Sequence, residues 1–314
     1  MAKIQNKYVQ PNYLKNFQRL REKIKEEKLR VAFIVNEHQK WAYTLLYKEF
    51  EKNPHFEPMI ILSPTTTITE NKSKFLASYD ELVHFFERTD MKVVSGYNKQ
   101  SNTYLDLAKF DLDVVFYQQP WGIAKKQDFV HVSENALICY VPYCVYTLKS
   151  SDNYLDFFHP LLWKYFVETP SYVDDYKKEF HATNCVAVGI SKLDNWLEIN
   201  VNRGNEIWNN TSKKRVVYAP HHSFFDRHSM ATFHKNGLFI LELAQKHPET
   251  YWIFKPHPQF PDMLLKNKIM TEKEIKDYYD AWNSIGKVYN SGDYYDLFAT
   301  SDVMITDCIS FLTE

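Results

Sequence analysis

Short apolar runs alternate with longer amphipathic stretches along most of the chain. The runs are rich in Val, Ile, Phe and Tyr and predict buried strands at 30–35, 56–62, 91–94, 112–117, 137–141, 165–168, 185–188, 215–219, 251–254, 287–289 and 303–306. Helical spacing of apolar residues lies between many of them, at 8–28, 41–50, 74–88, 231–246, 260–284 with a break, and 294–300. This alternation favours parallel βαβ units over an antiparallel sheet.

A polar stretch at 200–214, rich in Asn with Thr and Ser, separates two such series and is expected to be a loop. We therefore predict two domains, 1–200 and 201–314, each Rossmann-like with a doubly wound parallel sheet. A chain of 314 residues is long enough for two domains of about 150 residues each. The predicted helix after the last strand has barely begun at Glu314, so we expect the second domain to be truncated.

Composition excludes several classes of function. Lys and Arg (38) nearly cancel Asp and Glu (39), which gives no support for electrostatic binding of nucleic acid. The seven glycines are too far apart for a P-loop or a GxGxxG dinucleotide site. The four cysteines show neither zinc spacing nor disulfide density, which is typical of a reducing compartment.

No signal core and no run of 18 apolar residues is visible. The sequence thus indicates a cytoplasmic protein. Peripheral contact with the inner face of the cell membrane stays open, since the first helix carries several cationic residues beside its apolar face.

Polar side chains follow three of the predicted strands in the second half of the chain. Residues at the carboxyl ends of neighbouring parallel strands meet at one edge of the sheet, where ligands of such folds collect. Imidazole, ammonium, hydroxyl and carboxyl groups gather there, which suits an anionic, phosphate-bearing ligand: His221, His222, Lys255, His257, Thr306, Asp307 and Ser310.

Each of these groups also has a plain structural interpretation. His257 lies between two prolines and could donate to a phosphoryl oxygen, or it could pack under its turn. Lys255 could neutralise a diphosphate or point into solvent. Thr306 and Ser310 flank an expected helix N-terminus, an anion site, whereas Asp307 suits a helix cap or a ribose hydroxyl.

Several short motifs occur together in order. They are Gly-Ile-Ser-Lys-Leu-Asp (189–194), Val-Tyr-Ala-Pro (217–220), Lys-Pro-His-Pro (255–258), Asp-Tyr-Tyr-Asp-Leu (293–297) and Ser-Asp-Val-Met-Ile-Thr-Asp (301–307). In order and spacing this set resembles the CDP-glycerol glycerophosphotransferase family, the teichoic-acid and capsule polyol-phosphate transferases.

That resemblance implies a GT-B-like fold, with the two domains facing a cleft and a CDP-activated polyol donor on the second. It also implies transfer of glycerol phosphate, or a related polyol or sugar phosphate, to a hydroxyl of a glycan or lipid-linked acceptor, with release of CMP and no essential metal or other cofactor. In the family pattern His257 contacts the donor phosphate and Thr306 and Ser310 are phosphate ligands. Glu314 falls where the family has an acidic residue.

The first domain departs from the family pattern, because the Trp-His-Gly segment has only Pro-Trp-Gly (120–122) as its counterpart. Without that histidine, Glu37 or His38 after the first strand is a candidate general base, or a helix cap. His222 is a further catalytic candidate. Gln118 and Trp121 are expected to line the acceptor side, although Trp121 could belong to the core.

Two other functions stay open at this stage. One is a GT-B glycosyltransferase that uses a nucleotide sugar, and the other is a non-catalytic binding domain of a larger capsule enzyme.

Overall fold

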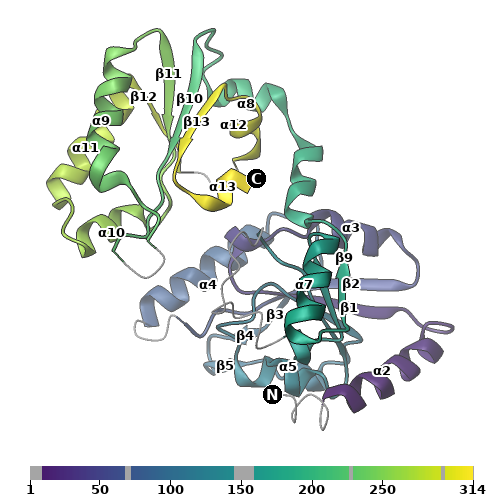
Figure 1. Ribbon diagram of the computed structural model, residues 1–314. Coiled ribbons are helices and arrows are strands. Elements are labelled where there is room, and N and C mark those ends of the chain that lie inside the picture. The colour runs from purple at the N-terminus through teal and green to yellow at the C-terminus, as the bar shows by residue number, and fades with distance from the viewer. Residues whose placement is uncertain (1–8, 68–71, 145–158, 226–228, 291–293, 314) are drawn as a thin grey trace. The chain divides into compact units, whose positions relative to one another are not determined.

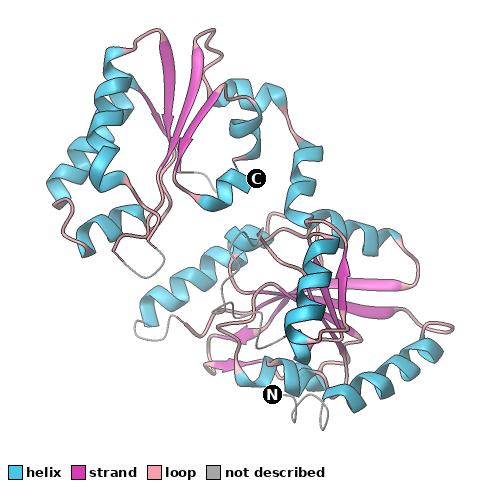
Figure 2. Cartoon of the chain, viewed as in Figure 1, coloured by secondary structure: helices cyan, strands magenta, loops and turns pink. Residues whose placement is uncertain are grey.

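The computed structural model describes residues 9–67, 72–144, 159–225, 229–290 and 294–313. The chain forms two compact units, Met1–Asp194 (unit 1) and Asn195–Glu314 (unit 2). Each unit consists of a parallel sheet with helices on both faces (Figures 1 and 2). The predicted α/β fold class with two Rossmann-like sheets is confirmed. The roles predicted for the two domains, acceptor side and donor side, are not decided by this division.

Unit 1 contains a seven-stranded sheet of order β3-β2-β1-β6-β7-β8-β9. Its strands are β1 (Leu29–Val35), β2 (Phe56–Leu62), β3 (Val93–Ser95), β6 (Val114–Tyr117), β7 (Leu137–Tyr140), β8 (Lys164–Val167) and β9 (Cys185–Ala187). All pairs in this sheet are parallel. The strand order reverses direction between β1 and β6, so the topological switch point of this unit lies at their carboxyl ends.

The helices of unit 1 cover both faces of the sheet. They are α2 (Gln10–Lys23), α3 (Thr44–Lys52), α4 (Lys72–Phe86), α5 (Phe129–Val132) and α7 (Pro170–Phe180). Side chains alternate along β1: Ala32 and Ile34 pack in the core with α2, α5 and α7, whereas Val31, Phe33 and Val35 pack in the core with α3 and α4. This is why β1 is apolar from Val31 to Val35 instead of alternating with polar residues.

Unit 2 contains a four-stranded parallel sheet of order β12-β11-β10-β13. Its elements are α8 (Val201–Ile207), β10 (Lys214–Ala219), α9 (Phe233–Lys246), β11 (Thr250–Phe254), α10 (Phe260–Lys266), α11 (Glu272–Ile285), β12 (Gly286–Val288), α12 (Tyr295–Ala299), β13 (Val303–Thr306) and α13 (Ile309–Thr313). Helices α9, α10 and α11 share one core with the sheet, and α8 and α12 share the other. The switch point lies between β10 and β13.

The two units share the same pair of Arg–Asp hydrogen bonds at the amino ends of β1 and β10. In unit 1 the backbone N–H of Arg30 donates to the Asp113 carboxylate (2.8 Å), and the Asp113 N–H donates to the Arg30 carbonyl (3.0 Å). In unit 2 Arg215 and Asp302 exchange the same two bonds, at 2.8 and 2.9 Å. Asp113 is buried and is also held by Arg19 and Lys23 of α2, while Asp302 is exposed.

Some elements differ from the sequence prediction. The polar stretch 200–214 is not simply a loop, because Asn200 caps α8 by accepting the Arg203 N–H (3.1 Å). A small antiparallel pair, β4 (Tyr97–Asn98) and β5 (Thr103–Tyr104), and helix α7 were not predicted. No described helix is both long and apolar enough to cross a membrane.

Candidate functional site

Three loops meet at the carboxyl edge of the unit 2 sheet, where they follow the neighbouring strands β11, β10 and β13 in the chain. The ring of His222, which follows β10, stacks on the ring of His257, which follows β11, with centroids 3.8 Å apart and planes at 18°. The His221 ring lies 4.6 Å from that of His222. Residues 36 positions apart in the chain are thereby joined in one row of three imidazoles.

Asp307, which follows β13, connects this row to the third loop. Its Oδ1 accepts the backbone N–H of His221 (2.5 Å), and its Oδ2 accepts both the N–H (2.6 Å) and the hydroxyl (2.8 Å) of Thr232, just before α9. The Thr306 hydroxyl donates to the Ala219 carbonyl (2.7 Å) and accepts the Cys308 N–H (2.9 Å). Both side chains therefore hold the loops in place, and direct contact with a phosphate remains a prediction for each.

Hydrogen bonds from the backbone set the tautomers of two histidines. Nδ1 of His257 accepts the Gln259 N–H (3.1 Å), and Nδ1 of His221 accepts the Ser223 N–H (3.1 Å). In a neutral imidazole the proton is then on Nε2, which becomes a donor. Burial, followed by the neighbouring His222, His221 and Lys255, lowers the pKa of His257 to about 3. His257 is thus a neutral N–H donor near neutral pH.

Lys255 does not point into solvent. Only 6% of its surface is exposed, and its ammonium group lies over the rings of Tyr294 (5.0 Å), Tyr289 (5.8 Å) and Phe311 (5.8 Å). Tyr289 follows β12 and Phe311 belongs to α13, so the aromatic side chains come from both sides of β11. Cation–π attraction of this kind keeps a lysine charge at a fixed position while it is removed from bulk water.

The remaining predicted donor-binding residues lie at the C-terminal end of the chain. Ser310 is in α13, a helix of five residues, with its hydroxyl 3.2 Å from the Cys308 sulfur. Glu314 lies outside the described residues. Across the described ranges, no group of three or more His, Cys, Asp or Glu side chains is arranged to hold a metal ion.

A second polar cluster lies at the switch point of unit 1. Gln118, after β6, is fully buried; its Oε1 accepts the N–H groups of Asn36 (3.0 Å) and Glu37 (3.1 Å), and its Nε2 donates to the Glu37 carbonyl (2.8 Å). Gln118 therefore clamps the turn after β1. Whether it also contacts an acceptor is not decided by this geometry.

Glu37 and Trp121 lie around one lysine. Lys40 Nζ is 2.6 Å from Glu37 Oε1 and 2.7 Å from Gln119 Oε1, and it lies over the rings of Trp121 (5.2 Å) and Tyr143 (5.4 Å). This is a half-buried carboxylate–ammonium pair beside two aromatic faces. The base and acceptor-side roles of Glu37 and Trp121 remain predictions.

His38 turns toward α4, where its ring stacks on Phe85 at 5.2 Å. Burial lowers the pKa of His38, and the charges of Glu81 and Glu37 partly oppose this. Its role as a base remains a prediction. The sequence pattern missed Lys40, Gln119 and Tyr143, although Lys40 comes one turn after Glu37 and Tyr143 follows a strand end like the other candidates.

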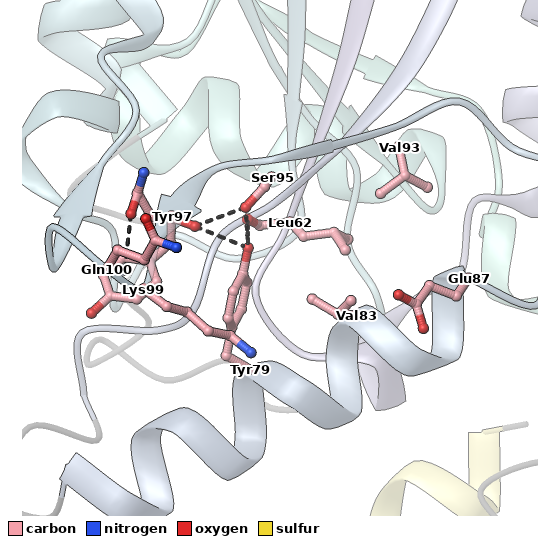
Figure 3. Close-up of a pocket in the computed structure, with 10 residues that line it drawn as sticks. Leu62, Tyr79, Val83, Glu87, Val93, Ser95, Tyr97, Lys99 and Gln100 are labelled. Atoms are coloured by element: carbon pink, nitrogen blue, oxygen red, sulfur yellow. Dashed lines mark hydrogen bonds between the residues drawn. The ribbon is translucent and has the colours of Figure 1, made fainter.

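A separate hollow of about 550 Å³ lies in unit 1 beside the edge strand β3 (Figure 3). Its polar groups bond to one another: the Tyr79 hydroxyl lies 2.6 Å from Ser95 Oγ, which donates to the Tyr97 carbonyl (2.7 Å). Lys99 on its rim pairs with Asp80. None of the predicted site residues lines this hollow, which lies away from the β1–β6 switch point.

Comparison with known proteins relates the chain to solved structures alone, since no protein-family model and no curated protein matches it. It is similar to UDP-GlcNAc 2-epimerase from Methanocaldococcus jannaschii (15% identity, TM-score 0.57, covering 90% of this chain and 79% of that one). It is also similar to the enzyme from Neisseria meningitidis bound to UDP-GlcNAc (13%, 0.55, 90% and 77%) and to a UDP complex of Staphylococcus aureus MnaA (13%, 0.54, 91% and 76%).

The resemblance to the CDP-glycerol glycerophosphotransferase family is therefore wrong, and so are the CDP-activated polyol donor and the transfer of glycerol phosphate. Solved structures that share the architecture include UDP-GlcNAc 2-epimerases, which act on UDP-linked substrates. The motifs misled because most of them mark strand ends, where any sheet of this type collects polar groups. At these identities the likeness establishes a GT-B-like, Rossmann-type α/β fold.

Proposed function

We propose that this chain is an enzyme that acts on a UDP-linked sugar, and that unit 2 binds the uridine diphosphate moiety at its carboxyl edge. The position agrees with the rule that ligands of open α/β sheets bind at the switch point. Support also comes from the solved structures of the same architecture, two of which contain UDP-GlcNAc or UDP.

The observation that carries the proposal is that the loop after β11 holds both a neutral imidazole donor, His257, and a cation at a fixed position, Lys255. His257 offers its Nε2–H group, because Nδ1 is occupied by the Gln259 N–H. Lys255 supplies a positive charge held among aromatic rings. When the bond between the sugar C1 and the diphosphate oxygen breaks, negative charge builds on the diphosphate, and donors already in place stabilise it without reorganising.

The cluster of Glu37, Lys40 and Trp121 in unit 1 is assigned to sugar or acceptor hydroxyls. An aromatic face suits the C–H surface of a sugar ring, and a carboxylate suits a hydroxyl whose proton must leave. In this assignment Glu37 is the general base and Lys40 orients its carboxylate.

Two reactions share this cleavage of the sugar–diphosphate bond. In glycosyl transfer the sugar passes to an acceptor hydroxyl and UDP leaves. In 2-epimerisation the C2 proton and UDP leave together and form a C1–C2 double bond, and a proton then adds to the opposite face of C2 as UDP adds back to C1. The second reaction is the one named for several solved structures of this architecture.

Calorimetric titration with UDP-GlcNAc, UDP and CDP tests the proposal first. We expect UDP-GlcNAc and UDP to bind and His257→Asn to weaken both by about tenfold, the value of one lost hydrogen bond to a charged group. His247→Asn, an exposed histidine paired with Glu249 in the same unit, is the matched control and should bind normally. Absence of any binding of UDP and UDP-GlcNAc at millimolar concentration would sink the proposal.

Proton NMR in D₂O then separates the two reactions. Deuterium at C2 together with the C2 epimer identifies epimerisation, whereas free UDP that accumulates only with a glycan acceptor identifies glycosyl transfer. Peripheral membrane contact of the chain stays a prediction, which vesicle sedimentation would test.

A further inference from the structure

The row of three imidazoles at the edge of unit 2 has a consequence that goes beyond binding. Resting on the proposed function, we propose that binding of a UDP-sugar is coupled to the uptake of one proton by this row, and that His222 is the ring that receives it.

The geometry allows at most one proton in addition to those of the neutral rings. The His222 and His257 rings are stacked at 3.8 Å, and the His221 ring is 4.6 Å from His222. Two imidazolium charges at such distances repel each other strongly, so like charges keep one another neutral. The row can therefore hold one charge but not two.

One ammonium group and one carboxylate lie at the strand ends beside the row. Lys255 at the end of β11 contributes positive charge, while Asp307 at the end of β13 directs its two oxygens to His221 N and to Thr232. Half-burial adds a desolvation cost for any charged ring. Burial, followed by the neighbouring His222, His221 and Lys255, lowers the pKa of His257 to about 3, so this ring is neutral at pH 7 in the absence of ligand.

A bound diphosphate reverses this balance. Its two negative charges next to the rings favour an imidazolium form, just as a neighbouring carboxylate does. A proton added at Nδ1 of His257 or His221 would break the hydrogen bond from the Gln259 or Ser223 N–H. The proton is therefore assigned to His222, the central ring, which would lie between two neutral rings.

Titration calorimetry of UDP-GlcNAc at pH 7, repeated in phosphate, MOPS and Tris, measures proton uptake directly. These buffers differ in ionisation enthalpy. The slope of a plot of the observed binding enthalpy against the buffer ionisation enthalpy therefore gives the number of protons bound. The diphosphate of UDP-GlcNAc is a diester that does not titrate near neutral pH, so any protons taken up are bound by the protein and supplied by the buffer. We expect uptake approaching about one proton per site and an affinity that increases as the pH falls from 8 to 6.

Two variants assign the proton. His222→Asn should reduce the uptake to near zero while UDP-GlcNAc still binds, and His247→Asn should leave the uptake unchanged. Tight binding of UDP-GlcNAc to the wild-type protein with a slope of zero would overturn this inference and leave the proposed function standing. Unchanged uptake in His222→Asn would overturn the assignment to that ring. No binding at all would overturn both the proposed function and this inference.

Discussion

Replacement of Asp307 by asparagine probes the loop that carries the histidines. The carboxylate accepts three hydrogen bonds, one from the His221 N–H through Oδ1 and two from Thr232 through Oδ2. An amide of the same shape has a single acceptor oxygen. In either orientation its NH₂ group therefore faces a backbone N–H, and one donor loses its partner.

The cost follows from those contacts. A hydrogen bond to a charged group contributes about 1.5–3 kcal/mol, and leaving a partly buried donor unsatisfied adds to the loss. We expect the free energy of unfolding of unit 2 to fall by about 2–4 kcal/mol, which for a unit of this size lowers its Tm by roughly 10 °C. Because His221 and His222 move with the loop, affinity for UDP-GlcNAc should fall about tenfold or more.

Differential scanning calorimetry and UDP-GlcNAc titration are the two assays, and Asp302→Asn is the matched control. Asp302 also accepts a backbone N–H of β10, from Arg215 at 2.8 Å, but it does so at the opposite, amino end of the strand and in contact with solvent. Asp302→Asn should therefore change the Tm only a little and leave the affinity for UDP-GlcNAc unchanged. If Asp307→Asn kept the wild-type Tm and affinity, or if Asp302→Asn lowered affinity equally, the loop would not depend on Asp307.

Three further predictions concern other positions. The folded unit keeps His257 neutral down to about pH 3, whereas the unfolded chain protonates this ring near pH 6.5. Unit 2 should therefore lose stability as the pH falls below 6.5, by at most about 1.4 kcal/mol per pH unit. Urea unfolding of the wild type and of His257→Asn at pH 7 and 5 measures this dependence, which should be smaller in the variant. Gly122→Ala places a Cβ 2.0 Å from Thr65 Oγ1 at a φ of +67° and should destabilise unit 1 by about 2–4 kcal/mol in urea unfolding. Gly189→Ala, at a φ of +89° with open space around it, should cost only about 1 kcal/mol. Equal costs for the two variants would contradict the steric argument. Lys255→Met should keep the fold, since a thioether packs well on aromatic rings. In calorimetry it should weaken UDP-GlcNAc binding about tenfold and make the affinity less sensitive to salt. Unchanged binding would show that Lys255 does not contact the ligand.

Local sequence patterns determined most of the fold. The strand from Leu29 to Val35 and the strand from Val303 to Thr306 could be predicted because both are short, apolar and followed by polar residues. The same periodicity indicated which strand ends carry His221, Lys255 and Asp307, since residues directly after a parallel strand lie at its carboxyl edge. Helix α8 escaped prediction because two Asn and one Gly among its seven residues favour a loop, and only the cap from Asn200 shows where it begins.

The tertiary structure decided what those groups do. The stacking of His222 on His257, the aromatic surroundings of Lys255 and the use of Asp307 to hold a loop all join residues far apart in the chain, and no local pattern encodes such pairings. The family motif pointed to the wrong nucleotide because short strand-end motifs mark where a ligand binds, whereas its identity depends on contacts made across the whole sheet edge. The sequence by itself therefore determined the sheets and which side chains follow their strands, and the packing of side chains from different strands determined how these groups contact one another.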